Sequence, residues 1–257
     1  MLHNIIKGIK AYAGTFGLIS KLGLWKYFGI PILISVLTAF GIGLLAYGLS
    51  DDLGAFISRI WIWEWGKETF TTISEVIGGI TIIAIGLILY KHIIMALSAP
   101  FMNPVSERIE QHYTGIDPKE QHIHRETTFQ EQLWRGIRIN VRNLAKELLL
   151  TIPILLISFI PLIGFLSTIL LFLVQAYYAG FGNMDYTLER HFKYRESIDF
   201  VSSHKGIAIG NGIVFMLFLL IPVIGVILVL PLSVTAASTK TVELLKSENH
   251  LSIKQND

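Results

Sequence analysis

The sequence predicts an all-α integral membrane protein with two long transmembrane helices, two partly penetrating helical hairpins and an N-terminal amphipathic helix. First, hydrophobic residues make up 52% of the chain and charged residues only 16%, against roughly a quarter in soluble domains. Second, residues 27–50 and 76–99 are long apolar stretches. Third, residues 148–180 and 207–238 carry no charge, and each is interrupted by the pattern Pro-x-Ile-Gly. A repeated apolar segment with such an interruption is typical of paired broken helices in membrane proteins.

Composition also limits the class of function. The chain has no cysteine, which excludes disulfides, thiolate catalysis and cysteine-based metal sites. A net charge of +2 argues against nucleic-acid binding. The sequence has no nucleophile elbow, HExxH motif or carboxylate pair within an apolar span, so we expect neither an enzyme nor a cofactor. We expect residues 1–257 to form one membrane domain without a cleavable signal peptide, because lysine and glycine interrupt the first apolar residues.

Residues 3–20 have the pattern of an amphipathic helix. Lys7 and Lys10 fall on one side of a helical wheel, and the apolar residues gather on the other side. This pattern predicts a helix that lies on the membrane surface, and an ordinary buried helix is the alternative. The apolar residues are Ile5, Ile6, Ile9, Tyr12, Ala13, Phe16 and Ile19.

The first predicted span, residues 27–50, is uncharged and long enough for a hydrocarbon core of about 30 Å at about 1.5 Å per residue. Three of its glycines predict a thin face for close helix packing. They are Gly41, Gly43 and Gly48. The connection at 51–75 holds three tryptophans that we expect at the membrane interface. They are Trp61, Trp63 and Trp65.

The second predicted span, residues 76–99, differs because it contains Lys91 and His92. Lys91 either extends its amine to the membrane interface or faces an aqueous path. Pro100 should end this helix, because proline disfavours the helical conformation of the residue before it. Asn103 is then a suitable N-cap for a new helix.

Residues 104–147 are predicted to form helices on the cytoplasmic side. Within them, four basic residues recur at steps of three and four and so share one helix face. This face either meets lipid headgroups or forms an electropositive entry that concentrates anions. The four are Arg135, Arg138, Arg142 and Lys146. The histidines between the helices match no metal-ligand spacing, so we expect no metal site. They are His112, His122 and His124.

Charge distribution and arm length favour hairpins over full spans for 148–180 and 207–238. Only Arg59, Lys67 and Lys91 of the 21 Lys and Arg residues lie outside the N-terminal segment, the middle region, the inter-repeat loop and the tail at 240–257. The positive-inside rule places those regions in the cytoplasm, so each broken segment begins and ends on one side. Each arm reaches only roughly 20 Å at 1.5 Å per residue, less than the ~30 Å core. Such short hairpins need protein neighbours, which favours a homo-oligomer.

Several short motifs, taken in order, make the chain resemble the CysZ-type sulfate permeases and their relatives, the etoposide-induced protein superfamily. They are Gly23-Leu24 before Tyr27-Phe28-Gly29-Ile30-Pro31, Ala99-Pro100-Phe101-Met102-Asn103 with Glu107 and Glu110, Phe159–Gly164, Tyr177–Tyr186 with Asp185, and Ile221-Pro222 with the apolar run to Pro231. The resemblance covers about residues 9–239. It implies an inner (plasma) membrane protein, often oligomeric, with two spanning helices, two hairpins and passive or gradient-driven sulfate entry.

The resemblance also implies an anion site at the turn before the first span. In the family, Gly-Leu is followed by arginine and the turn binds sulfate, whereas here Gly23 and Leu24 are followed by Trp25 and Lys26. We therefore expect Gly23, Leu24 and Lys26 to bind sulfate or a similar oxyanion through amides and one ammonium group. The alternative function is a non-transporting membrane scaffold or assembly protein, because amphipathic and re-entrant helices also shape bilayers.

Overall fold

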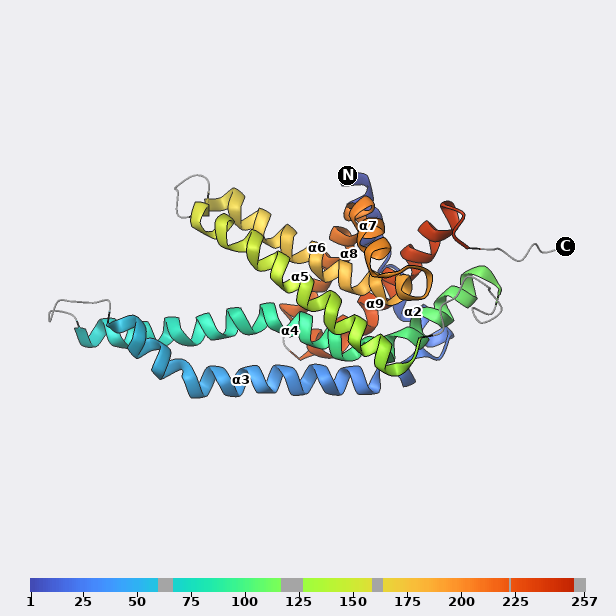
Figure 1. Cartoon of the computed structure of the whole chain (residues 1–257). Helices are drawn as coiled ribbons and strands as arrows, with labels where there is room; N and C mark the ends of the chain where they lie inside the picture. The colour runs from blue at the N-terminus through green and yellow to red at the C-terminus, as the bar shows by residue number, and fades with distance from the viewer. Residues whose placement is uncertain (60–66, 117–126, 159–163, 222, 252–257) are drawn as a thin grey trace.

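The computed structural model describes residues 1–59, 67–116, 127–158, 164–221 and 223–251, and these residues contain helices but no strand (Figure 1). The all-α prediction is confirmed. In chain order the helices are α1 (Leu2–Lys10), α2 (Thr15–Lys21), the 3-10 helix η1 (Leu24–Tyr27), α3 (Gly29–Ser58), α4 (Lys67–Thr114), α5 (Phe129–Ser158), α6 (Gly164–His191), α7 (Tyr194–Ser203), α8 (Lys205–Leu219) and α9 (Ile224–Ser247).

Four stretches of these helices are long and apolar enough to cross a bilayer. They are Gly29–Phe56, Ile85–Thr114, Gly164–His191 and Ile227–Ser247. The pair α7 and α8, bent by 87° at the residue between them, passes the same test together. The chain is therefore a multi-pass membrane protein. The predicted tryptophan anchors at 61, 63 and 65 lie outside the described residues.

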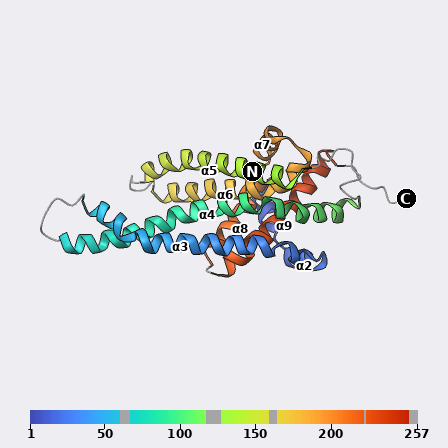
Figure 2. The same ribbon diagram turned by 60° about the horizontal axis from the view of Figure 1, so that its bottom comes forward.

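Helices α3 and α4 form a long antiparallel hairpin that extends away from the rest of the molecule (Figures 1 and 2). They contain 30 and 48 residues, or about 45 and 72 Å at 1.5 Å per residue. Among the described residues, nothing lies within 4 Å of a Cβ built on Gly41, Gly43 or Gly48, so the predicted thin face does not pack against those residues. The close approach is instead at Gly86, where a Cβ would overlap the side chain of Ile42.

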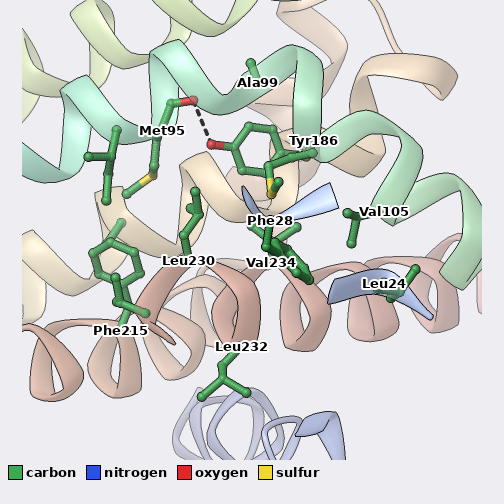
Figure 3. Packing of buried hydrophobic residues seen from close by; sticks show 14 of the residues in the cluster. Leu24, Phe28, Met95, Ala99, Val105, Tyr186, Phe215, Leu230, Leu232 and Val234 are labelled. Atoms are coloured by element: carbon green, nitrogen blue, oxygen red, sulfur yellow. Dashed lines mark hydrogen bonds between the residues drawn. The ribbon is translucent and has the colours of Figure 1, made fainter. Parts of the chain in front are cut away.

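Helix α4 continues through Pro100 and Pro104, so the predicted break at Pro100 is wrong. Pro100 has no amide hydrogen, so the Ala96 carbonyl four residues earlier loses its helical donor. In the same turn Tyr186 on α6 donates its hydroxyl to the neighbouring Met95 carbonyl at 2.7 Å (Figure 3). Gly136 on α5 packs directly against the same turn, since a Cβ there would lie 2.5 Å from that of Ala99. Tertiary packing therefore maintains a helix that local propensity would end.

The two Pro-x-Ile-Gly sequences lie where α5 gives way to α6 and where α8 gives way to α9. Residues 159–163 and 222 lie outside the described residues. In both places the glycine packs onto the carbonyl that ends the preceding arm. A Cβ on Gly164 would lie 2.8 Å from the Ser158 oxygen, and one on Gly225 would overlap the Phe218 oxygen. Both repeats need glycine for the same steric reason.

Each predicted hairpin is part of a longer pair of helices. The last helix predicted within 104–147 and the first arm of the hairpin predicted at 148–180 are one helix, α5, of 30 residues. The tail predicted at 240–257 is helical as far as Ser247, where α9 ends. Val242 and Leu245 are buried there, so packing of α9 orders the first part of this polar tail.

The N-terminal segment forms two short helices, α1 and α2, separated by a turn with Gly14 at φ 84°. Helix α1 packs closely on α8, where a Cβ on Gly8 would lie 2.5 Å from the Ile207 carbonyl oxygen. Ile6, Ile9 and Phe16 remain exposed. The prediction of a single helix over residues 3–20 is therefore wrong, because the turn between Lys10 and Thr15 divides it. Its position on the membrane surface stays a prediction.

The main core lies where η1, α4, α6, α8 and α9 meet (Figure 3). Its side chains include Leu24, Phe28, Met95, Val105, Phe215 and Val234. Helices α6 and α8 cross at very short distance, because a Cβ on Gly180 would overlap the Ala208 carbonyl and one on Gly212 the Ala176 carbonyl. Small residues at such crossings are a common solution in membrane proteins.

Candidate functional site

The C-terminal half of α6 carries a series of buried polar and charged side chains. Each is at most 5% exposed. Such groups are stable in a protein interior only when hydrogen bonds or opposite charges compensate the lost hydration. Their partners come from α4, α5, α7, α8 and α9. The series consists of Asn183, Asp185, Thr187, Glu189 and Arg190.

The first ionic cluster joins α4 to the end of α6. The Arg190 Nη2 atom lies 2.8 Å from Glu110 Oε2, and His191 Nε2 lies 3.1 Å from the same oxygen. Arg190 also donates to the Ser106 hydroxyl at 2.6 Å. The Glu110 side chain is fully buried. This cluster fixes the second half of α4, after Pro100, against α6.

The second ionic cluster joins α5 to α6 and α7. Arg135 binds Asp185 in a bidentate manner, with N–O distances of 2.9 and 3.2 Å, and donates to the Phe192 carbonyl at 2.8 Å. Ser197 on α7 donates its hydroxyl to Asp185. Burial opposes the guanidinium charge, but the carboxylate of Asp185 outweighs burial, so the pKa of Arg135 is raised.

The third ionic cluster lies within a candidate span. Lys91 Nζ is 2.7 Å from Glu147 Oε1, and His92 Nε2 is 3.0 Å from Glu147 Oε2. Lys91 also donates to the Gln175 carbonyl on α6 at 3.3 Å. Lys91 is 0% exposed and Glu147 1%. Neither predicted alternative for Lys91 holds, because its amine reaches neither the interface nor an aqueous path and is paired with a buried carboxylate. A cavity of about 200 Å³ with mostly apolar walls adjoins His92 and Asn140 between α4 and α5.

An uncharged polar network crosses the core near these clusters. Asn183 on α6 donates to the Asn211 amide oxygen on α8 at 2.9 Å, and Asn211 donates to the Ser233 carbonyl on α9 at 3.0 Å. Tyr12 donates to the Ser233 hydroxyl at 2.7 Å. Burial raises the pKa of Tyr12, so its hydroxyl stays protonated as a donor. The N-terminal segment is thereby tied to the second hairpin.

The structure divides the four basic residues predicted as an electropositive entry. Arg135 is buried and paired, and only the other three lie toward the surface of α5. The guanidinium of Arg138 lies 4.0 Å from the ring centre of Tyr194. Arg142 donates to the Asn143 side chain at 2.8 Å, and Lys146 is exposed.

The predicted anion site at Gly23, Leu24 and Lys26 forms the start of η1. Gly23 adopts the left-handed conformation at φ 63° and donates its amide to the Ser20 carbonyl at 3.2 Å. Leu24 points into the core, whereas Lys26 is exposed, with its amine 5.1 Å from the ring of Tyr27. The contacts of η1 are with α2, α3 and α4, and α5 packs on α4 and α6. Both predicted cationic regions therefore pack on α4.

Sequence reasoning missed the three buried ion pairs. The partners are 50 to 80 residues apart in the chain. The available signal was the position of Lys91 and His92 immediately after an apolar stretch and of Glu147 immediately before another. Charged residues in such places need partners, but the sequence did not show which.

Residues 11–230 match the family described as sulfate transporter CysZ/etoposide-induced protein 2.4. The chain belongs to this family. The match includes η1, both Pro-x-Ile-Gly sequences and all three ionic clusters. The resemblance inferred from short motifs is thereby confirmed. A search of curated proteins found no match.

Proposed function

We propose that the protein is a transporter or channel for sulfate or a similar oxyanion in the inner (plasma) membrane. The observation that carries the proposal is the match to a sulfate transporter family over residues 11–230. The burial of Lys91 and Glu147 next to an apolar surface supports it. Ionisable groups inside membrane-spanning helices are costly and usually mark ion pathways. Transport of this kind needs no catalytic group.

In this proposal, cations outside the buried clusters attract the anion. Arg138, Arg142 and Lys146 on α5 form an electropositive entry that raises the local anion concentration. Arg135 acts as a positioning residue, since its pairing with Asp185 fixes α5 against α6. Gly23, Leu24 and Lys26 bind the anion at the membrane surface, where the amine of Lys26 is exposed.

We further propose that α3 and α4 span the bilayer and that the α5–α6 and α8–α9 pairs enter it part-way from the cytoplasmic side. Helix α8 has 15 residues, or about 23 Å at 1.5 Å per residue, which is short of the ~30 Å core. The tip residues Leu220 and Val223 are apolar and exposed. Such tips need protein or lipid around them, which supports a homo-oligomer.

Labelling of introduced cysteines tests the hairpin arrangement. Because the chain has no cysteine, Val223→Cys would carry the only thiol. This thiol should resist a membrane-impermeant maleimide from both sides of sealed vesicles, although Val223 is 69% exposed on the protein surface. Lys146→Cys is the control and should react from the cytoplasmic side. Rapid reaction of Val223→Cys from the outer side would replace the hairpin with two full spans.

Uptake of labelled sulfate by reconstituted vesicles tests the functional proposal. Lys26→Ala and Arg138→Ala should each slow uptake several-fold at low ionic strength, and less at high salt, because exposed charges are screened. Lys10→Ala on α1 is the matched control, since Lys10 is also exposed but lies outside both cationic regions. Equal effects of all three substitutions would reduce the proposal to a general effect of net charge.

One observation favours the alternative of a non-transporting scaffold or assembly protein. The cations Lys91, Arg135 and Arg190 are each paired with a buried carboxylate, and such pairs can act as structural ties between helices. A scaffold would give no sulfate flux but a stable complex with another membrane protein. Co-purification after mild solubilisation, combined with the uptake assay, distinguishes the two functions.

A further inference from the structure

A second cavity, of about 290 Å³, lies among the turn between α1 and α2, the end of α4 and the middle of α9. It is separate from the surface-exposed cations of α5 and from the start of η1. The walls of this cavity are more polar than those of the cavity beside His92. They include an ammonium, an imidazole, a phenol and two hydroxyl groups. The lining residues are Ala11, Ala13, Gly14, Thr15, Leu18, Lys21, His112, Tyr113 and Thr239.

The charges around this cavity favour an anionic ligand. Lys21 and His112 line it from opposite elements, α2 and α4, and none of the described lining residues is acidic. Lys246 on α9 reaches its edge, where its amine donates to the Tyr113 carbonyl at 3.1 Å. Cationic and hydroxyl donors that converge in this way are suited to the several acceptor oxygens of a phosphate group.

Thr239 provides an independent indication of a ligand. Its side chain is 9% exposed, and its hydroxyl has no hydrogen-bond partner among the described residues. An unsatisfied buried hydroxyl costs about 1–3 kcal/mol, and native proteins seldom leave one without a reason. Thr239 also lines the cavity, so this side chain lies next to any molecule bound there.

We propose that this cavity binds a phosphate group, supplied either by the headgroup of an anionic lipid or by a free phosphate. Its volume is close to the lower limit of about 300 Å³ for small-molecule sites, which suits a glycerophosphate headgroup with its acyl chains outside. The exposed Phe16 on α2 and the exposed Ile9 on α1 lie on the elements that form the rim. They provide the apolar contact that such chains would need. This inference is independent of sulfate transport.

The test measures binding to the full-length protein in detergent, through shifts in its thermal unfolding. The ligands are a short-chain phosphatidylglycerol, the matching phosphatidylcholine and inorganic phosphate. Lys21→Gln should weaken binding about tenfold, as expected for the loss of one charge-assisted hydrogen bond. Lys10→Gln is the matched control, because Lys10 is an exposed lysine that does not line the cavity, and it should leave affinity unchanged.

Substitutions of two threonines distinguish an effect on ligand binding from an effect on protein stability. Thr239→Val should leave unfolding without ligand unchanged or raise its temperature, because the lost hydroxyl has no partner, but it should weaken binding several-fold. Thr241→Val is the control, because the Thr241 hydroxyl is also buried without a partner on α9 but does not line the cavity. It should not alter binding.

Each outcome decides the proposal. Saturable binding of phosphatidylglycerol alone, lost in Lys21→Gln and Thr239→Val, supports the lipid source. Binding of inorganic phosphate with the same losses supports the free-phosphate source. Absence of saturable binding, or equal affinity in the cavity variants and their controls, would overturn it. Because the readout is binding, these results hold whether or not the protein transports sulfate.

Discussion

The two halves of α6 differ in how far their side chains are exposed. Near its start, Phe165 and Leu166 are 79% and 65% exposed, whereas Phe181 and Leu188 are fully buried further along. Charged residues are also buried in the second half, where Asp185 is paired with Arg135. In water such an arm would expose its apolar surface at a large cost. The comparison indicates that lipid covers the outer arms, which are the parts of the helices with exposed apolar side chains, such as the first half of α6. Ion pairs organise the region where the helices converge.

Substitutions on α5 should show the largest difference between the two regions in the free energy of unfolding that is lost. Glu147→Leu removes the carboxylate that compensates buried Lys91, and loss of one partner of such a pair costs about 3–5 kcal/mol. Leu156→Ala changes an exposed apolar residue of the outer arm and should cost less than about 0.5 kcal/mol in detergent. Thermal or denaturant unfolding in detergent measures both changes.

The double variant Lys91→Met/Glu147→Leu sharpens this result. It removes both charges and should recover most of the stability lost in Glu147→Leu, because a well-packed apolar pair can replace a buried ion pair. If the single variant Glu147→Leu were as stable as the wild type, the ionic cluster would not organise the core.

Alanine substitutions of two glycines should differ less in their effect on stability. Gly212→Ala places a methyl group against the Ala176 carbonyl, so the α6–α8 crossing must widen at a cost of about 1–3 kcal/mol. Gly48→Ala on α3 meets nothing within 4 Å and should be neutral or slightly stabilising, because alanine favours the helix. Unfolding in detergent reports both, and equal stability of the two variants would contradict the close packing described here.

Phenylalanine substitutions of two tyrosines should show the smallest difference in their effect on stability. Tyr186→Phe removes the hydrogen bond to the Met95 carbonyl beside Pro100 and should cost about 1 kcal/mol. Tyr47→Phe changes a side chain that is 87% exposed on α3 and should have no measurable effect. A shift in unfolding for Tyr47→Phe alone would mean that the outer arm has protein contacts in detergent.

The sequence predicted the features that depend on local pattern. Apolar length located the candidate spans of α3 and α4, although those of α6 and α9 had been predicted as hairpin arms. The repeated Pro-x-Ile-Gly located both breaks, because its glycine must pack on the preceding arm. The failure at Pro100 has a tertiary cause, because other helices pack on the turn before it. Gly136 lies against Ala99 and the Ala96 carbonyl, and Tyr186, 91 residues away from Met95 in the chain, donates to the Met95 carbonyl. The sequence did not predict the burial of Arg135, for the same reason. A helical wheel gives the side of α5 on which Arg135 lies, but not that Asp185 meets it there.

Sulfate uptake by the wild-type protein in reconstituted vesicles tests the central claim most directly. Vesicles that contain the protein should take up labelled sulfate faster than empty vesicles when sulfate is supplied down its gradient, and unlabelled sulfate should compete. Uptake equal to that of empty vesicles under both signs of the gradient would contradict transport and leave the scaffold function as the account of this fold.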